Sequence, residues 1–158
     1  MSIETVDNFL DKPEEIIQFC RKSLYKWGER DTACKPRTGM VCNLIHECPE
    51  VSIILKKIFE LKPMFKNKRI RRIYINCFAP SEQPYFHIDG ETGTTMLYYA
   101  TDVYDPDEHG ETQFLGKDDV IYGILPKPNR LVIFDANIRH RATAFRSKHR
   151  FTIAIKFE

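Results

Sequence analysis

His87 and Asp89 stand two positions apart, and this spacing is the first feature of the sequence that could support chemistry. In an extended chain, side chains two positions apart leave the same face, so both can bind one metal ion. His140 follows the expected strand Leu131 to Phe134, where a neighbouring antiparallel strand can present it to the first pair. Two imidazoles and one carboxylate on one face of an octahedron suit non-haem Fe(II) and leave other positions open. The sequence predicts such a site at His87, Asp89 and His140.

Arg150 stands ten residues beyond His140, at the start of a segment with alternating apolar residues. Its planar guanidinium is a rigid fork that binds a carboxylate through two parallel hydrogen bonds. The alternate neighbours Thr152 and Ala154 are small, so this face of the segment can form the floor of a pocket. The pattern predicts an anchor for the distal carboxylate of a 2-oxo diacid, and the alternative is a surface cation.

The elements that come before these residues are expected to be mainly helical. Ile3 to Phe9 reads as a short strand, and Asp11 with Pro13 is typical of a helix start. The apolar face of this first helix is predicted to contain Ile16, Ile17, Cys20, Leu24 and Trp27. The segment from 29 to 48 is expected to be irregular apart from a strand at Met40 to Leu44. A second helix is expected from Pro49 to just before Pro63.

From Ile70 onward the apolar period changes to two, which indicates strands. We expect strands at Ile70 to Phe78, Thr94 to Ala100, Glu111 to Leu115, Val120 to Ile124, Leu131 to Phe134 and Phe151 to Phe157. Helices first and then many short strands predict a mainly β fold with a helical buttress, a jelly-roll barrel of the double-stranded β-helix type. Residues 1–158 are expected to form one domain, with 1–69 as the supporting part and 70–158 as the barrel core.

Composition narrows the possible partners and the compartment. The formal net charge of +2 is too small to favour nucleic acid or a membrane surface, and no apolar stretch is long enough to span a bilayer. A basic run at Lys66, Lys68, Arg69, Arg71 and Arg72 reads as a solvated face, with a phosphate-bearing substrate as the alternative if it lies beside the active-site mouth.

The five cysteines are odd in number and lack a CxxC pair, which favours reduced thiols and a cytoplasmic location. A zinc site at Cys34, Cys42, His46 and Cys48 is an alternative, although these spacings match no common zinc motif.

The order of motifs from residue 70 to 158 resembles the 2-oxoglutarate- and Fe(II)-dependent dioxygenase superfamily, most closely its prolyl 4-hydroxylase-like branch. The parts that carry this resemblance are His87-Ile88-Asp89, Met96 to Tyr99, Gly110 to Phe114, Pro126 to Arg130, Leu131 to Phe134, His140 and Arg150. His109 occupies the first position of what resembles a Gly-Gly-Glu-Thr segment. There Glu111 and Thr112 are expected to form a turn rather than to act in catalysis.

The resemblance implies that His87, Asp89 and His140 bind Fe(II) and that Arg150 forms a salt bridge with the C5 carboxylate of 2-oxoglutarate. It places Tyr99 near the cosubstrate pocket, with a core tyrosine on an apolar strand as the alternative. The implied cofactors are Fe(II), 2-oxoglutarate and O₂, with ascorbate as an optional addition. The implied enzyme is a hydroxylase that converts 2-oxoglutarate to succinate and CO₂.

The sequence departs from the family pattern before the first ligand. A tyrosine and a Pro-Gly pair are common there, whereas this chain has Phe78 and Pro80-Ser81. One cosubstrate hydroxyl is therefore missing, or it is supplied by Tyr74 or Tyr85.

The substrate and the function class keep alternatives open. A prolyl residue in a peptide or protein, a free amino acid or other small molecule, and an alkylated base all fit the resemblance. The candidate substrate loops are Thr32 to Met40 and Asp102 to Glu108. From other classes, the chain could be a cupin-like metal-binding protein or a catalytically silent binding module. A silent module is expected to lose a ligand or the anchor, and this sequence retains all four residues. Oligomeric state is left open.

Overall fold

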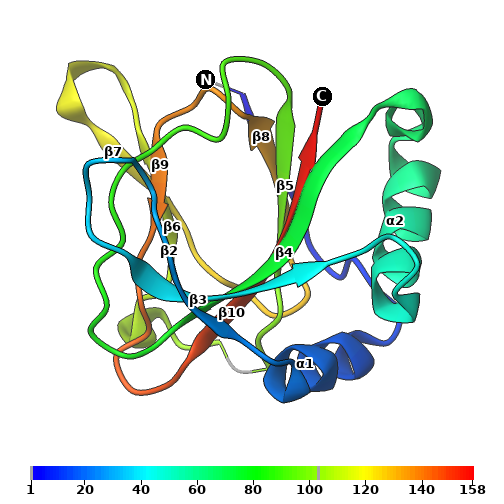
Figure 1. Ribbon diagram of the computed structural model, residues 1–158, viewed down its shortest axis with the longest axis horizontal. Coiled ribbons are helices and arrows are strands. Elements are labelled where there is room, and N and C mark those ends of the chain that lie inside the picture. The colour runs from blue at the N-terminus through cyan, green and yellow to red at the C-terminus, as the bar shows by residue number, and fades with distance from the viewer. Residues whose placement is uncertain (1, 103) are drawn as a thin grey trace.

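Two antiparallel sheets make up most of the computed structural model, which describes residues 2–102 and 104–158 (Figure 1). The larger sheet has seven strands in the order β1-β8-β5-β10-β4-β3-β2. Its strands are β1 (Ile3–Val6), β2 (Lys26–Glu29), β3 (Thr38–Leu44), β4 (Ile70–Phe78), β5 (Thr94–Tyr99), β8 (Leu131–Asp135) and β10 (Arg150–Phe157). The smaller sheet has the order β7-β6-β9, with β6 (Thr112–Leu115), β7 (Ile121–Ile124) and β9 (His140–Ala142).

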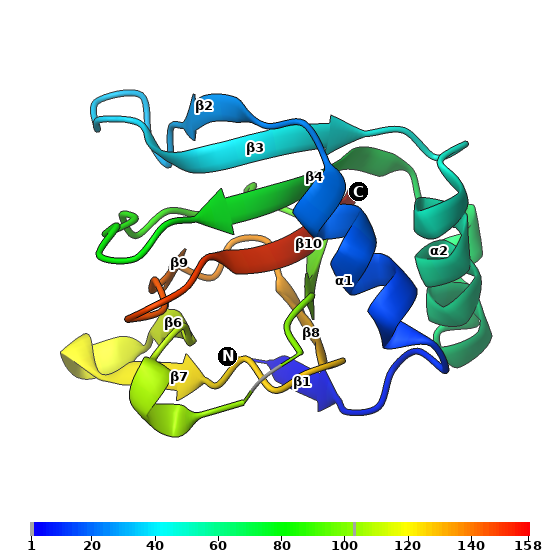
Figure 2. The same cartoon turned by 90° about the horizontal axis from the view of Figure 1, so that it is seen from below.

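The two helices α1 (Pro13–Lys22) and α2 (Pro49–Leu61) pack on the side of the larger sheet that faces away from the smaller sheet (Figures 1 and 2). Three short 3-10 segments, η1 (Pro63–Asn67), η2 (Pro106–Glu108) and η3 (Lys117–Asp119), complete the regular structure of the described residues. The predicted mainly β, jelly-roll fold with a helical buttress is confirmed. No helix among these residues is long and apolar enough to cross a membrane.

Strand β10 separates the hydrophobic core from the interior of the jelly roll. It lies between β4 and β5, with Ile153 opposite Ile75 and Tyr98. Ile153, Ile155 and Phe157 point into the core beneath the helices. Because side chains alternate along a strand, the residues between them face the opposite side, where they line a cavity.

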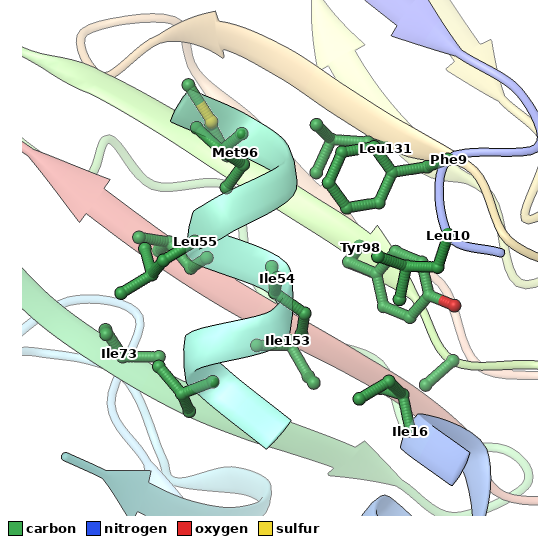
Figure 3. Close-up of a cluster of buried hydrophobic side chains, with 14 of the residues drawn as sticks. Phe9, Leu10, Ile16, Ile54, Leu55, Ile73, Met96, Tyr98, Leu131 and Ile153 are labelled. Carbon is green, nitrogen blue, oxygen red and sulfur yellow. The ribbon is translucent and has the colours of Figure 1, made fainter. Parts of the chain in front are cut away.

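The core between the helices and the larger sheet is continuous and apolar. Figure 3 shows Ile54 and Leu55 of α2 over the sheet residues Ile73 and Ile153, with Tyr98 nearby. Ile54 and Ile153 are fully buried. This packing stabilises β10 from behind and so fixes the strand that carries the cavity residues.

One sequence prediction for the first helix is wrong. The helix ends at Lys22, and Leu24 and Trp27 are 90% and 68% exposed instead of packing in the core. Ser23 is extended at the C-terminal cap, and the chain then pairs Lys26 with Val41 as the edge strand β2. Hydrogen bonding to β3 therefore replaces the last predicted turns of the helix.

The other elements follow the predictions closely. The helix α2 and all six strands expected from Ile70 onward are present, with boundaries that differ by a residue at several ends. Sequence reasoning missed β2 and the three-residue strand β9. The five cysteines, all within the described residues, are free thiols as predicted. Met1 and Val103, the latter in the predicted loop Asp102 to Glu108, lie outside the described residues.

We predict that Ile153→Ala lowers the free energy of unfolding by about 3 kcal/mol, because it leaves a cavity in the packed core beneath α2. Ile53→Ala is the matched control, since Ile53 is on the same helix as Ile54 but 44% exposed. The control should change stability by less than about 0.5 kcal/mol. Urea unfolding of both variants checks the prediction, and equal losses would contradict this account of the core.

Candidate metal and cosubstrate site

A short backbone pairing brings the two histidines together. His87 and His140 form an isolated antiparallel bridge, with His87 N donating to His140 O at 3.0 Å and His140 N donating to His87 O at 2.9 Å. His140 begins β9, whose other neighbour is β6 through the pair Phe114 and His140. The predicted antiparallel presentation of His140 to the first pair is therefore what the structure shows.

Asp89 joins them from the turn that follows His87. Its backbone N donates to Ala136 O at 2.8 Å, which ties this turn to the end of β8. Its carboxylate oxygens lie 3.6 Å from Nε2 of His87 and 3.6 Å from Nε2 of His140. One ligand atom from each of the three residues lies within 4.8 Å of the others. Among the described residues, the cysteine-rich zinc site considered as an alternative does not form a cluster that could hold a metal ion.

Hydrogen bonds fix both imidazoles in a form that can bind a metal. Nδ1 of His87 lies 3.0 Å from Tyr85 O, and Nδ1 of His140 lies 2.8 Å from Ile138 O. A carbonyl oxygen only accepts hydrogen bonds, so each neutral ring carries its proton on Nδ1. The lone pair on each Nε2 then faces Asp89, which is the usual arrangement of histidine ligands and their backbone partners.

The Asp89 carboxylate also fits a metal. Its Oδ2 accepts a hydrogen bond from Thr95 Oγ1 at 2.6 Å, which orients the group. Its Oδ1 is buried and accepts no hydrogen bond of regular geometry, although Lys156 Nζ lies 2.7 Å away as an ion pair. A buried carboxylate whose two oxygens each face an imidazole is a suitable ligand for a divalent cation. The residues present therefore fit Fe(II).

The electrostatics of the cluster favour the metal-binding protonation states of His140 and Asp89, whereas the pKa of His87 shifts in the opposite direction. Burial lowers the pKa of His140 to about 4, so this imidazole is neutral near pH 7. Burial acts to raise the pKa of Asp89, but its hydrogen bond with His87 and the charges of His140 and Lys156 hold that pKa well below its ordinary value. Burial likewise acts to lower the pKa of His87, but its contacts with Asp89, the Tyr85 carbonyl and Asp31 raise that pKa overall.

Arg150 lies in the same cavity as the three predicted ligands, and the cavity has a volume of about 260 Å³. The side chain is 1% exposed, with Nε donating to Gly110 O at 2.7 Å and one terminal nitrogen donating to Thr112 Oγ1 at 3.0 Å. The guanidinium also contacts the side chain of Tyr99. Thr152 Oγ1 also lines the cavity, and it is a buried hydroxyl without a hydrogen-bond partner. A carboxylate ligand could pair with both the guanidinium and this hydroxyl.

Tyr99 lies behind the cavity wall and is not among the described residues that line the cavity. Its hydroxyl contacts Thr112 Oγ1 at 2.7 Å and Ile124 O at 3.0 Å, and its ring lies 5.3 Å from the Arg150 guanidinium carbon. Tyr99 is therefore placed to position Arg150 and Thr112. Thr112 is on strand β6 and lines the cavity, so the expectation that it only forms a turn is wrong.

The structure distinguishes the other sequence candidates. Of the two tyrosines that could supply a cosubstrate hydroxyl, Tyr74 lines the cavity and Tyr85 is not among its described lining residues. The predicted acidic loop is also not among them, and its Asp102 pairs with Arg21 at 2.8 Å. Near the other predicted loop, Asp31 lines the cavity and its Oδ1 lies 3.4 Å from His87 Nδ1.

Sequence reasoning missed several cavity residues. Lys156 and Thr95 contact Asp89 directly, and Asp31 contacts His87. For Lys156 a signal was present, because it continues the alternation that starts at Arg150. The sequence contains no comparable signal for Asp31, which precedes the expected loop and approaches His87 only in the fold.

No protein-family model and no curated protein matches the sequence. Solved structures do match it. A prolyl-4-hydroxylase from Pseudomonas putida aligns with a TM-score of 0.78 and 14% identity over 99% of this chain and 91% of that chain. A prolyl hydroxylase from Trichoplax adhaerens, in complex with a hypoxia inducible factor peptide fragment, aligns with a TM-score of 0.79 and 16% identity over 98% and 82%.

The viral collagen prolyl hydroxylase of Paramecium Bursaria Chlorella virus-1, in its 2-oxoglutarate complex, aligns with a TM-score of 0.75 and 17% identity over 99% of this chain and 96% of that chain. At such identities a likeness shows the fold. The chain therefore has the fold of the 2-oxoglutarate- and Fe(II)-dependent oxygenases and, among them, of the prolyl hydroxylases.

Proposed function

We propose that the protein is a non-haem Fe(II) dioxygenase that couples the oxidative decarboxylation of 2-oxoglutarate to the hydroxylation of a C–H bond. The observation that carries this proposal is the convergence of ligand atoms from His87, Asp89 and His140 within 4.8 Å, in one cavity with the buried Arg150. A buried metal triad and a buried carboxylate anchor in one small cavity match the needs of this reaction.

Each residue has a distinct role in this proposal. His87, Asp89 and His140 hold Fe(II), and Thr95 orients the Asp89 carboxylate. Arg150 binds the C5 carboxylate of 2-oxoglutarate. The bound iron, with O₂ and 2-oxoglutarate, supplies the oxidising power, and the products from the cosubstrate are succinate and CO₂. The protein itself positions these groups and excludes water.

Tyr99 and Thr112 act on the cosubstrate through Arg150. The Thr112 hydroxyl lies within hydrogen-bond distance of both Arg150 and Tyr99, so the three groups form one buried network. Such a network restricts the rotamer of Arg150, and a preorganised fork loses less entropy when it binds a carboxylate. Thr152 Oγ1 adds a hydroxyl on the same strand face.

For the substrate we propose a C–H bond in a peptide, a protein or a small molecule, with a prolyl residue as the first candidate. The support is the likeness to three prolyl hydroxylases, one of which is in complex with a peptide fragment. A cupin-like metal-binding protein or a silent binding module is the alternative function. An intact triad beside an intact anchor favours the enzyme, because a binding module needs neither.

We predict that anaerobic addition of Fe(II) and 2-oxoglutarate to metal-free protein produces a weak visible metal-to-ligand charge-transfer band. His87→Ala should abolish the band because it removes a ligand whose Nε2 faces the site. His46→Ala is the matched control, since His46 is outside this group of ligands, and it should leave the band unchanged. Absence of the band in the wild-type protein would refute the dioxygenase proposal and favour the cupin-like or silent alternatives.

We predict that Arg150→Lys raises the dissociation constant of 2-oxoglutarate by at least about tenfold, which corresponds to about 1.4 kcal/mol. Lysine keeps the charge but loses the planar fork and its contacts with Gly110 and Thr112. Isothermal titration calorimetry of the Zn(II)-loaded protein measures the change, with the exposed Arg69→Lys as the control. Unchanged affinity in Arg150→Lys would show that 2-oxoglutarate is anchored elsewhere.

A further inference from the structure

The two histidines of the triad are held by different surroundings. The ring of His140 packs against the buried rings of Phe134 and Phe114, with centroid distances of 4.7 Å and 6.0 Å, and its side chain is 9% exposed. His87 lies in an isolated bridge outside the named strands, and its side chain is 19% exposed. Aromatic packing therefore orients His140, whereas the orientation of His87 depends more on polar contacts.

Asp31, in the connection between β2 and β3, provides such contacts. Its side chain is 8% exposed, and its Oδ1 lies 3.4 Å from Nδ1 of His87. Its Oδ2 accepts a hydrogen bond from Tyr85 N at 2.7 Å, and Tyr85 O lies 3.0 Å from the same Nδ1 of His87. The Asp31 carboxylate and the Tyr85 backbone thus both contact the Nδ1 side of the imidazole. The opposite nitrogen, Nε2, is the one that faces Asp89.

The position of this carboxylate is itself fixed by the fold. Thr38, the first residue of β3, donates from Oγ1 to Asp31 Oδ2 at 3.4 Å. The Tyr85 hydrogen bond ties the same oxygen to the segment that precedes the metal ligands. A carboxylate beside the remote nitrogen of a histidine ligand fixes the ring orientation and strengthens the other nitrogen as a donor to the metal. For His140, the contact at Nδ1 is with a neutral group, the carbonyl of Ile138.

We propose that Asp31 is a positioning residue for the metal site, which holds the His87 imidazole in the orientation that binds the metal. This inference rests on the proposed function, since His87 acts in it as a metal ligand. Asp31 acts through His87, because the group of candidate ligands found among the described residues consists of the triad without Asp31. Asp31 also attaches the connection between β2 and β3 to the metal site, although this connection is distant from His87 in sequence.

Asp31→Asn is the informative variant because it keeps the shape of the side chain. A carboxylate has two acceptor oxygens, whereas an amide has one. The variant can therefore accept a hydrogen bond from Tyr85 N or from Nδ1 of His87, but not from both. The contact with Tyr85 N is the shorter of the two, so we expect the contact with His87 to be lost. Asp102→Asn is the matched control, since Asp102 pairs with Arg21 and is not among the described residues that line the cavity.

The first test is isothermal titration calorimetry of the metal-free proteins with Zn(II). Asp31→Asn should raise the dissociation constant of Zn(II) by at least about tenfold, which is the usual effect of removing the partner of a histidine ligand. Asp102→Asn should bind Zn(II) as the wild-type protein does.

The second test is proton NMR of the Co(II)-loaded proteins in water, where the Nδ1 protons of both histidine ligands give exchangeable, paramagnetically shifted signals. Asp31→Asn should move the signal of His87 and leave the signal of His140 in place. His140 is an internal control, because a general loss of structure would move both signals. If Asp31→Asn does not fold, Asp31→Glu should have the same selective effect, since it displaces the carboxylate from Nδ1 of His87.

The inference is overturned if Asp31→Asn binds Zn(II) with wild-type affinity, or if the two ring signals move together or not at all. Either result, with the charge-transfer band retained, would leave the dioxygenase proposal standing. A wild-type protein that binds no Zn(II) would overturn both proposals.

Discussion

The alternation of side chains along β10 is the constraint on which the rest of this structure depends. The strand is central in the larger sheet, and each of its residues is buried or half-buried on both faces. Its odd-numbered residues pack beneath the helices, and its even-numbered residues line the cavity. A shift of register by one residue would place Arg150 and Lys156 in the apolar core and Ile153 in the cavity. The packing of the core therefore fixes the positions of the side chains that line the cavity.

The cavity contains charged groups whose burial is energetically unfavourable. Arg150, Asp89 and Lys156 are all largely buried, and burial of charge is unfavourable unless each group is paired or hydrogen-bonded. Most of these groups have partners, but Thr152 Oγ1 and Asp89 Oδ1 accept or donate no regular hydrogen bond. A bound ligand could pair with such polar atoms, and here they adjoin Arg150 and the three predicted metal ligands.

Much of the fold was predictable because periodicity in the sequence reports directly on burial. The six later strands and α2 followed from their alternation and their apolar spacing. The last part of the predicted first helix was wrong because Leu24 and Trp27 also fit helical spacing, while the pairing of β2 with β3 depends on residues distant in sequence. Strand β9 has three residues, which is too short for a periodic signal.

The site residues could be predicted where their spacing or the order of motifs in the sequence indicated them. His87 and Asp89 share a face at a spacing of two, and the small residues that alternate with the apolar ones after Arg150 indicated an anchor, which the family resemblance supported. The approach of Asp31 to His87, and the placement of Thr95 and Lys156 around Asp89, arise from tertiary structure. The role of Thr112 was missed because its contact with Arg150 joins strands of different sheets.

Anomalous diffraction from crystals soaked with Mn(II) and 2-oxoglutarate would show whether His87, Asp89 and His140 bind a metal beside the cosubstrate. We expect one strong anomalous peak in contact with Nε2 of His87, Nε2 of His140 and the Asp89 carboxylate. We also expect 2-oxoglutarate density that runs from this peak to Arg150. A peak elsewhere, or 2-oxoglutarate bound away from Arg150, would contradict the assignment of this cavity as a dioxygenase active site.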